Sequence, residues 1–361
     1  MSYQSEPPYQ HGSAERTGVL LINLGTPQAP TAPALRRYLA QFLWDPRVVE
    51  IPRPLWWLIL HGIILRVRPA KSAAKYASVW TPEGSPLLVH TRTQALRLLG
   101  ELGERGHGEV LVRHAMRYGE PSVATALDAL KAEGATRILL LPMYPHYAAA
   151  TTASALDAVA TWSQRIRRLP EFRSVNHYHD DPGYIAALAA SVRTHWQRNG
   201  RGGKLVMSFH GVPARSLTLG DPYHCECHKT ARLLAQALGL GQADYIVTFQ
   251  SRLGRAKWLE PYTEPTVKRL AGEGVKRIDA ICPGFAADNL ETLEEIAMEA
   301  RDAFLAAGGE QFSFIDCLND RPDWIGALAD LSLRHLQGWP LGAPEVDEAQ
   351  RQRALALGAS D

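Results

Sequence analysis

The chain has 361 residues, of which 46% are hydrophobic and 21% are charged, and its net charge at pH 7 is +2. This length suggests about two domains of roughly 150 residues each, with enough apolar residues for ordinary cores. A net charge near zero gives no case for a nucleic-acid partner, which usually meets a clustered basic face. The four cysteines are too few and too unevenly spaced for a disulfide scaffold, which favours a reducing cytoplasm.

The first 16 residues are polar, contain Pro7 and Pro8 and have no apolar core. We therefore expect a disordered lead-in over residues 1–16, and neither a signal peptide nor an anchor. Beyond it, β-branched and apolar runs predict eight strands, and amphipathic patterns between most of them predict helices. The predicted strands are residues 18–24, 109–115, 137–142, 174–178, 204–209, 244–249, 277–282 and 312–317. The predicted helices include residues 121–132, 154–167, 184–197, 229–238, 264–271 and 290–306, with a closing helix at 322–337.

Strands that alternate with helices predict an α/β fold, with parallel sheets covered on both faces and right-handed crossovers. Three internal sequence matches, which occur in the same order in both halves, indicate that one α/β unit is used twice. They divide the strands four and four, with a boundary near residue 172. The matches pair residues 19–27 with 205–213, 109–119 with 244–254, and 133–138 with 273–278.

The two halves differ in length between matched positions. From Leu24 to Arg117 is 93 residues, whereas from His210 to Arg252 is only 42. The first half therefore carries an insertion of about fifty residues, which we place at about 41–90. The predicted units are an N-terminal half, residues 17–172, completed by the helix at 322–337, a C-terminal half, residues 173–321, and a loosely ordered tail, residues 338–361.

The insertion contains the apolar stretch PRPLWWLILHGIILRVRP at residues 52–69. Its apolar core, residues 55–65, is 11 residues long, whereas a membrane-spanning helix needs about 20. Two functional interpretations stay open: an apolar lip over a flat ligand, or a membrane-surface patch in which Arg53, Arg66 and Arg68 extend toward the headgroups. The third interpretation is an ordinary buried helix.

His210 ends the predicted strand in KLVMSFHGVP, where Gly211 and Pro213 begin a turn. Ligands of open α/β sheets bind beyond the carboxyl ends of the strands, so this histidine is a candidate reactive group. A histidine that only caps the strand through a backbone hydrogen bond is the alternative interpretation.

A second candidate is the segment CPGFAADNLETLEEIAMEAR, which begins at Cys282. Asp288 is a plausible N-cap, and Glu291, three residues later, completes a capping-box pattern. Glu291, Glu295 and Glu299 then recur every four residues along one face of the predicted helix. Such a row suits a divalent cation in transit, although a solvated acidic face is the alternative and accounts well for Glu294.

The segment HCECH, residues 224–228, contains metal-ligand types, but its spacing is unlike that of zinc sites, whose paired cysteines usually have two to four residues between them. The residue types would allow a metal site at Cys225 and Cys227, but this spacing argues against it. Residues 23–26 lack a glycine-rich dinucleotide motif, and the sequence has no P-loop motif.

Several long motifs resemble ferrochelatases of the proteobacterial type, and the likeness runs from about residue 17 to 337. They are NLGTP, QFLWDPRVVEIPRPLWW, YASVW with GSPL, MRYGEP, SFHGVP, GDPY, FQSRLGRAKWLEPYT and CPGFAADNLETLEEI. The resemblance implies two similar Rossmann-like, chelatase-type domains, each with a mainly four-stranded parallel sheet flanked by helices, and a porphyrin in the cleft between them.

The resemblance also implies an activity, the insertion of Fe²⁺ as substrate into protoporphyrin IX to give haem, the final step of haem biosynthesis. His210 and Glu291 match the catalytic and metal-contacting pair that face each other across the cleft. Glu295 and Glu299 match acidic positions linked to metal delivery or proton removal. Positions that match the porphyrin pocket, including the lip tryptophans, are Leu24, Tyr76, Ser85, Arg117, Tyr118, Trp258, Trp56 and Trp57.

The chain departs from the family pattern in three places. Asn289 stands where many relatives carry histidine, and no cysteine follows Cys317, so no iron–sulfur cluster is expected. Leu24 stands where coproporphyrin-using relatives carry tyrosine, which favours protoporphyrin. The alternatives are a chelatase for coproporphyrin III or another metal, and a non-catalytic porphyrin or haem carrier, which would not need His210 and Glu291. We expect a cytoplasmic protein with weak peripheral contact to the inner membrane through the lip.

Overall fold

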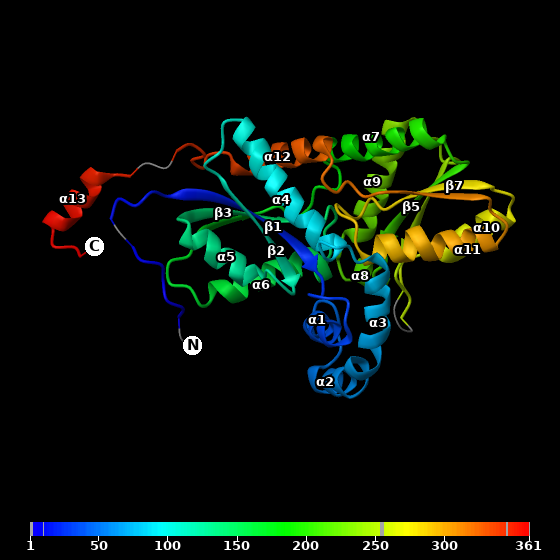
Figure 1. Cartoon of the computed structure of the whole chain (residues 1–361), viewed down its shortest axis with the longest axis horizontal. Helices are drawn as coiled ribbons and strands as arrows, with labels where there is room; N and C mark the ends of the chain where they lie inside the picture. The colour runs from blue at the N-terminus through cyan, green and yellow to red at the C-terminus, as the bar shows by residue number, and fades with distance from the viewer. Residues whose placement is uncertain (1–2, 10, 253–255, 344–345, 361) are drawn as a thin grey trace.

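Two four-stranded, all-parallel sheets lie side by side along the long axis of the molecule (Figure 1). The computed structural model describes residues 3–9, 11–252, 256–343 and 346–360. The matched Gly254 lies outside these residues. Within the described chain, the alternation of strands and helices confirms the α/β fold with two similar halves.

The first sheet has the strand order β2-β1-β3-β4, with β1 in its interior. Its strands are β1 (Arg16–Gly25), β2 (Leu111–Tyr118), β3 (Ala135–Pro142) and β4 (Glu171–Ser174). The strand predicted at 174–178 is misplaced, because β4 ends where that prediction begins. Val175 and Tyr178 are buried, as strand residues would be, but they belong to the loop after β4.

The second sheet repeats the first, with the order β6-β5-β7-β8. Its strands are β5 (Lys204–His210), β6 (Tyr245–Gln250), β7 (Arg277–Ile281) and β8 (Gln311–Ile315). Each strand of one sheet therefore has a counterpart at the same place in the other. This correspondence confirms the duplication that the internal sequence matches predicted.

The helices form two layers over each sheet. Alternate residues of β1 face opposite layers: Leu20 and Ile22 pack on α5 and α6, whereas Val19 and Leu21 pack toward α4 and α12. The helical segments, with π-helices marked η, are α1 (Ala32–Trp44), α2 (Arg53–Ile59), η1 (Leu60–Ile64), α3 (Leu65–Val79), α4 (Pro86–Glu104), α5 (Val123–Ala132), η2 (Ala149–Ala153), α6 (Ser154–Ser163), α7 (Pro182–Asn199), α8 (Arg215–Thr218), α9 (Tyr223–Leu238), α10 (Thr263–Gly272), η3 (Glu291–Ala300), α11 (Arg301–Ala306), α12 (Pro322–Leu336) and α13 (Glu348–Ala356).

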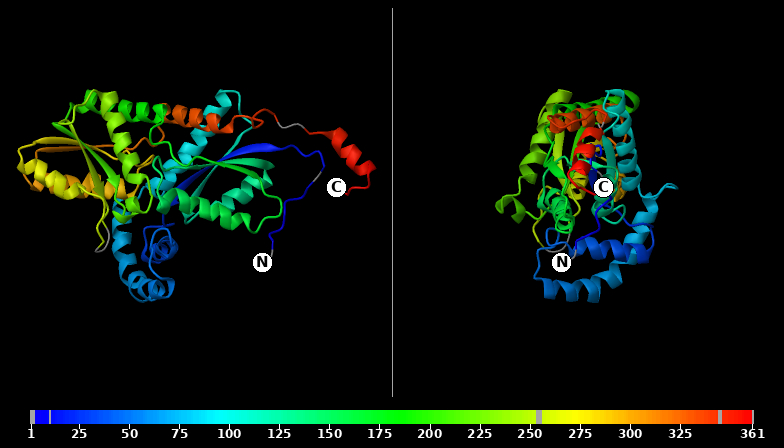
Figure 2. Two further views of the ribbon diagram at one scale, coloured as in Figure 1. Left: turned by 180° about the vertical axis from the view of Figure 1, so that it is seen from behind. Right: turned by 90° about the vertical axis from the view of Figure 1, so that its left-hand side faces the viewer.

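The insertion projects from the body of the molecule as α1, α2, η1 and α3 (Figures 1 and 2). It thus occupies residues 32–79, whereas the sequence predicted about 41–90; α4 belongs to the layer over the first sheet instead. Its inner face is a small core that includes Leu35, Leu39, Leu60 and Leu65. We refer to this projecting unit as the lip.

The two ends of the chain make contacts that differ from the prediction. In the segment before β1, expected to be disordered, Glu6 accepts hydrogen bonds from the backbone N–H groups of Arg167 and Arg168 at 2.9 and 3.1 Å. After α12, Trp339 Nε1 donates to Glu171 at 3.0 Å. The tail expected to be loosely ordered contains α13, which has no buried residue and stands apart from the body (Figure 1).

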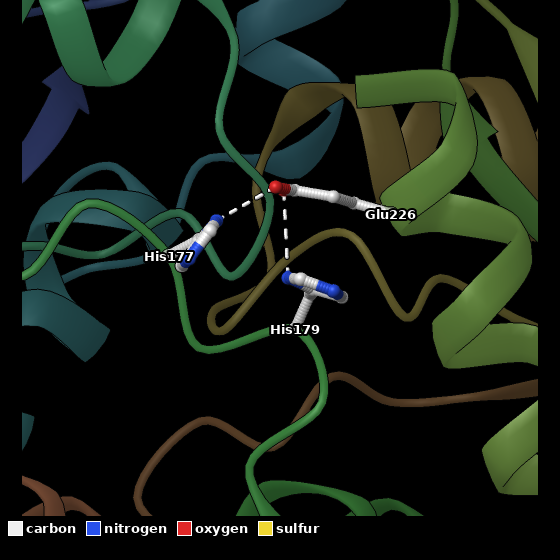
Figure 3. A group of neighbouring side chains, drawn as sticks. All are labelled: His177, His179 and Glu226. Carbon is white, nitrogen blue, oxygen red and sulfur yellow. Dashed lines mark hydrogen bonds and ion pairs between the residues drawn. The ribbon is translucent and has the colours of Figure 1, made fainter. Parts of the chain in front are cut away.

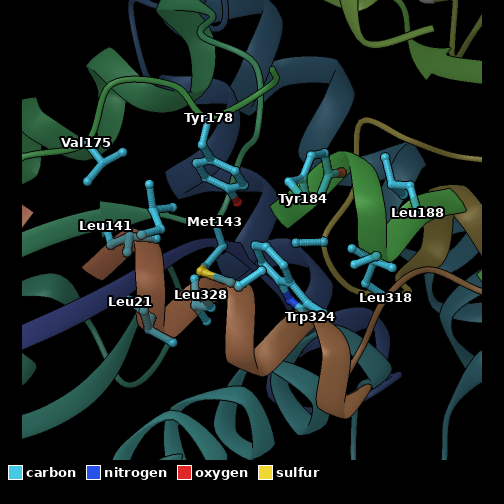
Figure 4. Packing of buried hydrophobic residues seen from close by; sticks show 14 of the residues in the cluster. Leu21, Leu141, Met143, Val175, Tyr178, Tyr184, Leu188, Leu318, Trp324 and Leu328 are labelled. Atoms are coloured by element: carbon cyan, nitrogen blue, oxygen red, sulfur yellow. The ribbon is translucent and has the colours of Figure 1, made fainter. Parts of the chain in front are cut away.

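Helix α12 lies between the halves and packs on both α4 and α7 (Figures 1 and 4). Trp324, only 1% exposed, lies 5.9 Å from the ring of Tyr178 and 5.3 Å from that of Tyr184. These rings belong to one hydrophobic cluster that extends from β1 and β3 to β5. The core is therefore continuous between the halves.

We expect Trp324→Ala to lower the free energy of unfolding by about 3–5 kcal/mol, because it removes a large buried ring and leaves a cavity. Denaturant titration followed by circular dichroism measures this loss. Trp57→Ala is the matched control, since Trp57 is 51% exposed, and it should cost less than about 1 kcal/mol. Equal losses in the two variants would contradict the assigned role of Trp324.

Candidate functional site

The candidate site forms where the carboxyl ends of β5 and β6 meet the start of η3. His210 is the last residue of β5 and Gln250 the last of β6. Leu24, near the end of β1, packs in the same hydrophobic cluster as Leu290, the residue before η3. The end of β1 in the first half therefore lies near the start of η3 in the second, at the carboxyl ends of the strands, where α/β sheets bind ligands.

His210 is oriented by a hydrogen bond from its ring to the backbone. Its Nδ1 lies 2.6 Å from the carbonyl oxygen of Gly211, and a carbonyl only accepts, so Nδ1 carries the proton. The neutral ring then has its lone pair on Nε2. A Cβ on Gly211 would lie 2.6 Å from the Gln250 carbonyl and 3.1 Å from the ring of Trp258, so only glycine fits this turn.

Gln250, the last residue of β6, connects β5 to η3 through its side-chain hydrogen bonds. The sequence analysis did not single it out, although it lies inside the quoted motif that begins FQSR. Its buried amide donates to the backbone carbonyl of Glu291 at 2.7 Å and accepts from Ser208 Oγ at 2.8 Å. Ser251, the next residue, donates to the carboxylate of Glu295. These bonds place Glu291 and Glu295 beside the strand that ends in His210.

The acidic helix is a π-helix over its first ten residues, Glu291–Ala300, rather than the α-helix that the sequence predicted. Long π-helical runs are rare, and shorter ones occur frequently at functional sites. The predicted capping box is wrong as well. Asn289 Oδ1 accepts the backbone N–H of Thr292 at 3.0 Å, while the carboxylate of Asp288 accepts from Asn319 at 2.7 Å.

The glutamates of this helix have different surroundings. Burial raises the pKa of Glu295, the hydrogen bond from Ser251 opposes that rise, and the charge of Glu291 adds to it. Glu294, which the sequence assigned to a solvated face, is buried and pairs with Lys75 of α3 at 2.7 Å. Lys75 also contacts Glu299 at 3.1 Å. Sequence pattern gave no sign of Lys75, because the pair joins residues more than two hundred positions apart.

Three predicted porphyrin-pocket residues belong to the first half, and two of them, Leu24 and Tyr76, pack in the same hydrophobic cluster as Leu290 at the start of η3. Tyr76 is buried in the lip on α3, which packs against η3. Burial and the negative charge of Glu291 raise the pKa of Tyr76. Ser85 accepts a hydrogen bond from Thr26 at 2.7 Å. Leu24 completes the group from the same cluster as Tyr76.

Arg117 and Tyr118 lie in a separate polar network around the buried carboxylate of Asp45. Arg117 pairs with Asp45 at 2.7 Å, and Tyr118 donates to it at 2.8 Å. Burial alone would raise the pKa of Asp45, but hydrogen bonds from Ser154 and Tyr118 and the charge of Arg117 hold it below its usual value. Both predicted residues line a hollow of about 710 Å³ that also includes Trp44; neither His210 nor Glu291 lines it.

The predicted tryptophans differ in their exposure. Trp258 packs on Gly211, next to His210, and its buried Nε1 has no hydrogen-bond partner among the described residues. Trp56 is 6% exposed and donates to the carbonyl of Leu43 at 2.7 Å. It anchors α2 in the core of the lip, so the prediction that it contacts a ligand is not supported by its position. Trp57, its neighbour, is exposed.

The HCECH segment is the first turn of α9 and does not assemble its two cysteines into one site. Residues two apart on a helix do not face each other: Cys225 is exposed and Cys227 is buried. The rings of His224 and His228, four apart, lie 4.5 Å from each other. Glu226, in the middle of the segment, points elsewhere and pairs with His177.

The two-domain fold is of the chelatase type. The structure resembles CbiX, described as the terminal enzyme for biosynthesis of siroheme in denitrifying bacteria, with a TM-score of 0.50, 14% identity and coverage of 89% of this chain and all of that one. It also resembles SirB from Bacillus subtilis, solved with Fe³⁺, with a TM-score of 0.51, 12% identity and coverage of 92% and 100%. At these identities the likeness concerns the fold alone.

Sequence comparison identifies the family. The ferrochelatase family model matches residues 16–336. A ferrochelatase from a Polaromonas strain is 68% identical over 99% of this chain and 100% of its own length. One from Methylibium petroleiphilum is 66% identical, with 99% of each chain covered. The chain belongs to the ferrochelatase family, as the motifs quoted above predicted.

We expect the stability of this protein to depend on the protonation of Glu295. The folded-state pKa of Glu295 lies above the ordinary value of 4.5, so the folded protein keeps this proton up to a higher pH than the unfolded chain does. The free energy of unfolding therefore falls as the pH rises from the unfolded-state pKa to the folded-state pKa. Glu295→Gln removes this loss, so its stability relative to the parent should increase from pH 4 to pH 7.

Thermal unfolding of both proteins across this pH range measures the effect. Glu264→Gln is the control, because the side chain of Glu264 is 61% exposed and bonded to Lys268 on the surface of α10. A difference between Glu295→Gln and the parent that stays constant with pH would contradict the raised pKa.

Proposed function

We propose that this chain inserts Fe²⁺ into protoporphyrin IX, with His210 and Glu291 as the catalytic pair. Membership in the ferrochelatase family supports the reaction. The observation that supports these residues is the fixed His210 ring, whose Nε2 lone pair lies at a strand end beside the π-helix that begins with Glu291.

Metal insertion releases two pyrrole protons, so the site needs groups that accept protons near neutral pH. His210 suits this role, because an imidazole with Nδ1 bonded to a carbonyl accepts a proton only at Nε2. Glu295 suits the role of accepting a proton that His210 passes on, since burial raises the pKa of its carboxyl group toward the working pH. Ser251 and Gln250 hold its carboxylate in place.

The row of Glu291, Glu295 and Glu299 is the proposed route for the substrate cation. Carboxylate oxygens are ligands for hard and borderline divalent ions, so successive glutamates offer successive contacts along the helix. Lys75 sits at the far end, paired with Glu299 and Glu294. Its single positive charge offsets part of the negative charge of Glu294 and Glu299, whereas Glu291 and Glu295 lie nearer to His210 and make no ion pair with Lys75 among those described.

The macrocycle is proposed to lie between the lip and the His210 turn. Leu24 and Tyr76 supply apolar surface on the first half, and Trp258 supplies a ring on the second. Arg117 and Trp44 line the hollow around Asp45, and we propose that they meet a propionate and an apolar edge of the macrocycle. The proposed reaction uses iron as substrate and assigns no role to an iron–sulfur cluster.

We expect His210→Ala to bind protoporphyrin with little change but to lose at least about a hundredfold in metallation rate, the usual contribution of a general base. Glu291→Gln should behave similarly. The assay is anaerobic, with ferrous iron and either protoporphyrin IX or coproporphyrin III, and follows the Soret band.

His335→Ala, a histidine of α12 outside the site, is the control and should keep the parental rate. Turnover retained in His210→Ala would contradict its role. Tight porphyrin binding without metallation of either substrate by the parent would instead indicate a carrier, and faster metallation of coproporphyrin would change the assigned substrate.

The outer surface of the lip is proposed to touch a membrane surface. Leu55, Trp57, Leu58 and Ile63 are between 51% and 61% exposed, and the exposed Arg66 and Arg68 lie on the helix that follows. Among the described residues no helix is both long and apolar enough to cross a bilayer. Apolar side chains beside arginines suit shallow insertion among anionic headgroups.

We expect the double variant Trp57→Ser, Leu58→Ser to sediment less with anionic vesicles than the parent, because it removes apolar area from the contact. Leu96→Ser is the matched control, since Leu96 is 62% exposed on α4, away from the lip. Equal sedimentation of the parent and the lip variant would rule out the contact.

A further inference from the structure

Two histidines in the connection between the halves face a glutamate of the second half (Figure 3). His177 and His179 belong to the loop that leaves β4 and enters α7, and Glu226 lies in the first turn of α9. The sequence analysis assigned no role to this glutamate or to the two histidines. None of the three takes part in the proposed reaction.

The three side chains converge at distances that suit metal coordination. His177 Nδ1 lies 2.7 Å from Glu226 Oε1, and His179 Nδ1 lies 3.5 Å from Glu226 Oε2. One ligand atom from each residue lies within 4.8 Å of the other two. Around a tetrahedral ion with bonds of 2.0–2.1 Å, ligand atoms are about 3.4 Å apart, which lies within this spread.

The hydrogen bonding of the cluster is incomplete without a further partner. His179 is buried, and its Nδ1 points at Glu226 yet makes no hydrogen bond within the described chain. Glu226 Oε2 already accepts the backbone N–H of Tyr147 at 2.7 Å. Buried imidazole nitrogens normally have a partner, and metal ions are frequent partners of neutral imidazole.

The supporting contacts hold the ligands before any ion binds. Thr230 Oγ1 donates to the backbone carbonyl of His179 at 2.7 Å, which fixes the loop on α9. The bond from Tyr147 orients the Glu226 carboxylate, as second-sphere donors do in metal sites. His177 is the most exposed of the three, with 52% of its side chain accessible, and so provides a path for an ion and for water.

We propose that His177, His179 and Glu226 form a binding site for a borderline divalent cation such as Zn²⁺, Co²⁺ or Fe²⁺, separate from His210 and Glu291. Two imidazoles and one carboxylate suit these borderline ions, whereas Mg²⁺ and Ca²⁺ prefer oxygen ligands alone. Water completes the coordination on the exposed side. The bound ion links the connecting loop to α9 and so stabilises the junction between the halves.

The test is metal binding without porphyrin, so it does not depend on the proposed reaction. Metal-free protein carrying His210→Ala, which removes the ligand of the candidate active site, is titrated with Co²⁺ by visible absorption and with Zn²⁺ by calorimetry. We expect one bound ion with the d–d bands of a Co²⁺ site that contains nitrogen ligands. Adding His179→Ala or Glu226→Gln should weaken binding at least about tenfold.

His177→Ala keeps the experiment decisive if a variant at a buried position folds poorly, because the side chain of His177 is half exposed. Without metal, this variant should have the same unfolding transition as the parent. It should nevertheless bind the metal ion more weakly than the parent. His228→Ala is the control, an exposed histidine on the same helix, and should bind as the parent does. If none of the three ligand variants changes affinity or the Co²⁺ spectrum, the cluster is only a hydrogen-bonded contact and the proposal is wrong.

Discussion

The arrangement of the candidate site depends on the amide of Gln250. A primary amide donates and accepts at fixed positions, and here its nitrogen bonds to the Glu291 carbonyl while its oxygen accepts from Ser208. The end of β5 and the start of η3 therefore cannot shift independently. Because the Gln250 side chain is buried, removing one of its partners leaves part of the amide without the hydrogen bond that offsets its desolvation. The placement of His210 relative to Glu291 rests on this constraint.

Duplication supplied two equal sheets, and the halves then diverged in what they carry between strands. The second half keeps short connections and provides the titratable groups, His210 and the glutamate row. The first half contains the lip, whose Lys75 reaches across to Glu294 and Glu299. The first half thus supplies most of the apolar surface proposed to contact the porphyrin, and the second half supplies most of the charged side chains. The proposed site therefore needs both halves.

Local patterns predicted most of the fold, since apolar runs and glycine turns are contiguous in sequence. The eight strands, the repeat and the position of His210 followed from such patterns. One error concerns a property set by contacts between distant segments: β4 was displaced because buried loop residues look like strand residues. The packing of Trp56 on α1 likewise has no signal in the local sequence. The π-helical hydrogen bonding of η3 and the pairing of Glu226 with His177 leave no local signature.

The packing of Trp324 against Tyr178 and Tyr184 has a consequence for biosynthesis. A ribosome makes the first sheet long before it makes α12, and domains generally fold in the order of their synthesis. Here the core beside β1 and β3 stays open until α12, the last 15 residues of the family-matched region, has emerged. A prematurely terminated chain therefore exposes apolar surface for chaperones and proteases, and only nearly complete translation yields a closed, porphyrin-competent protein.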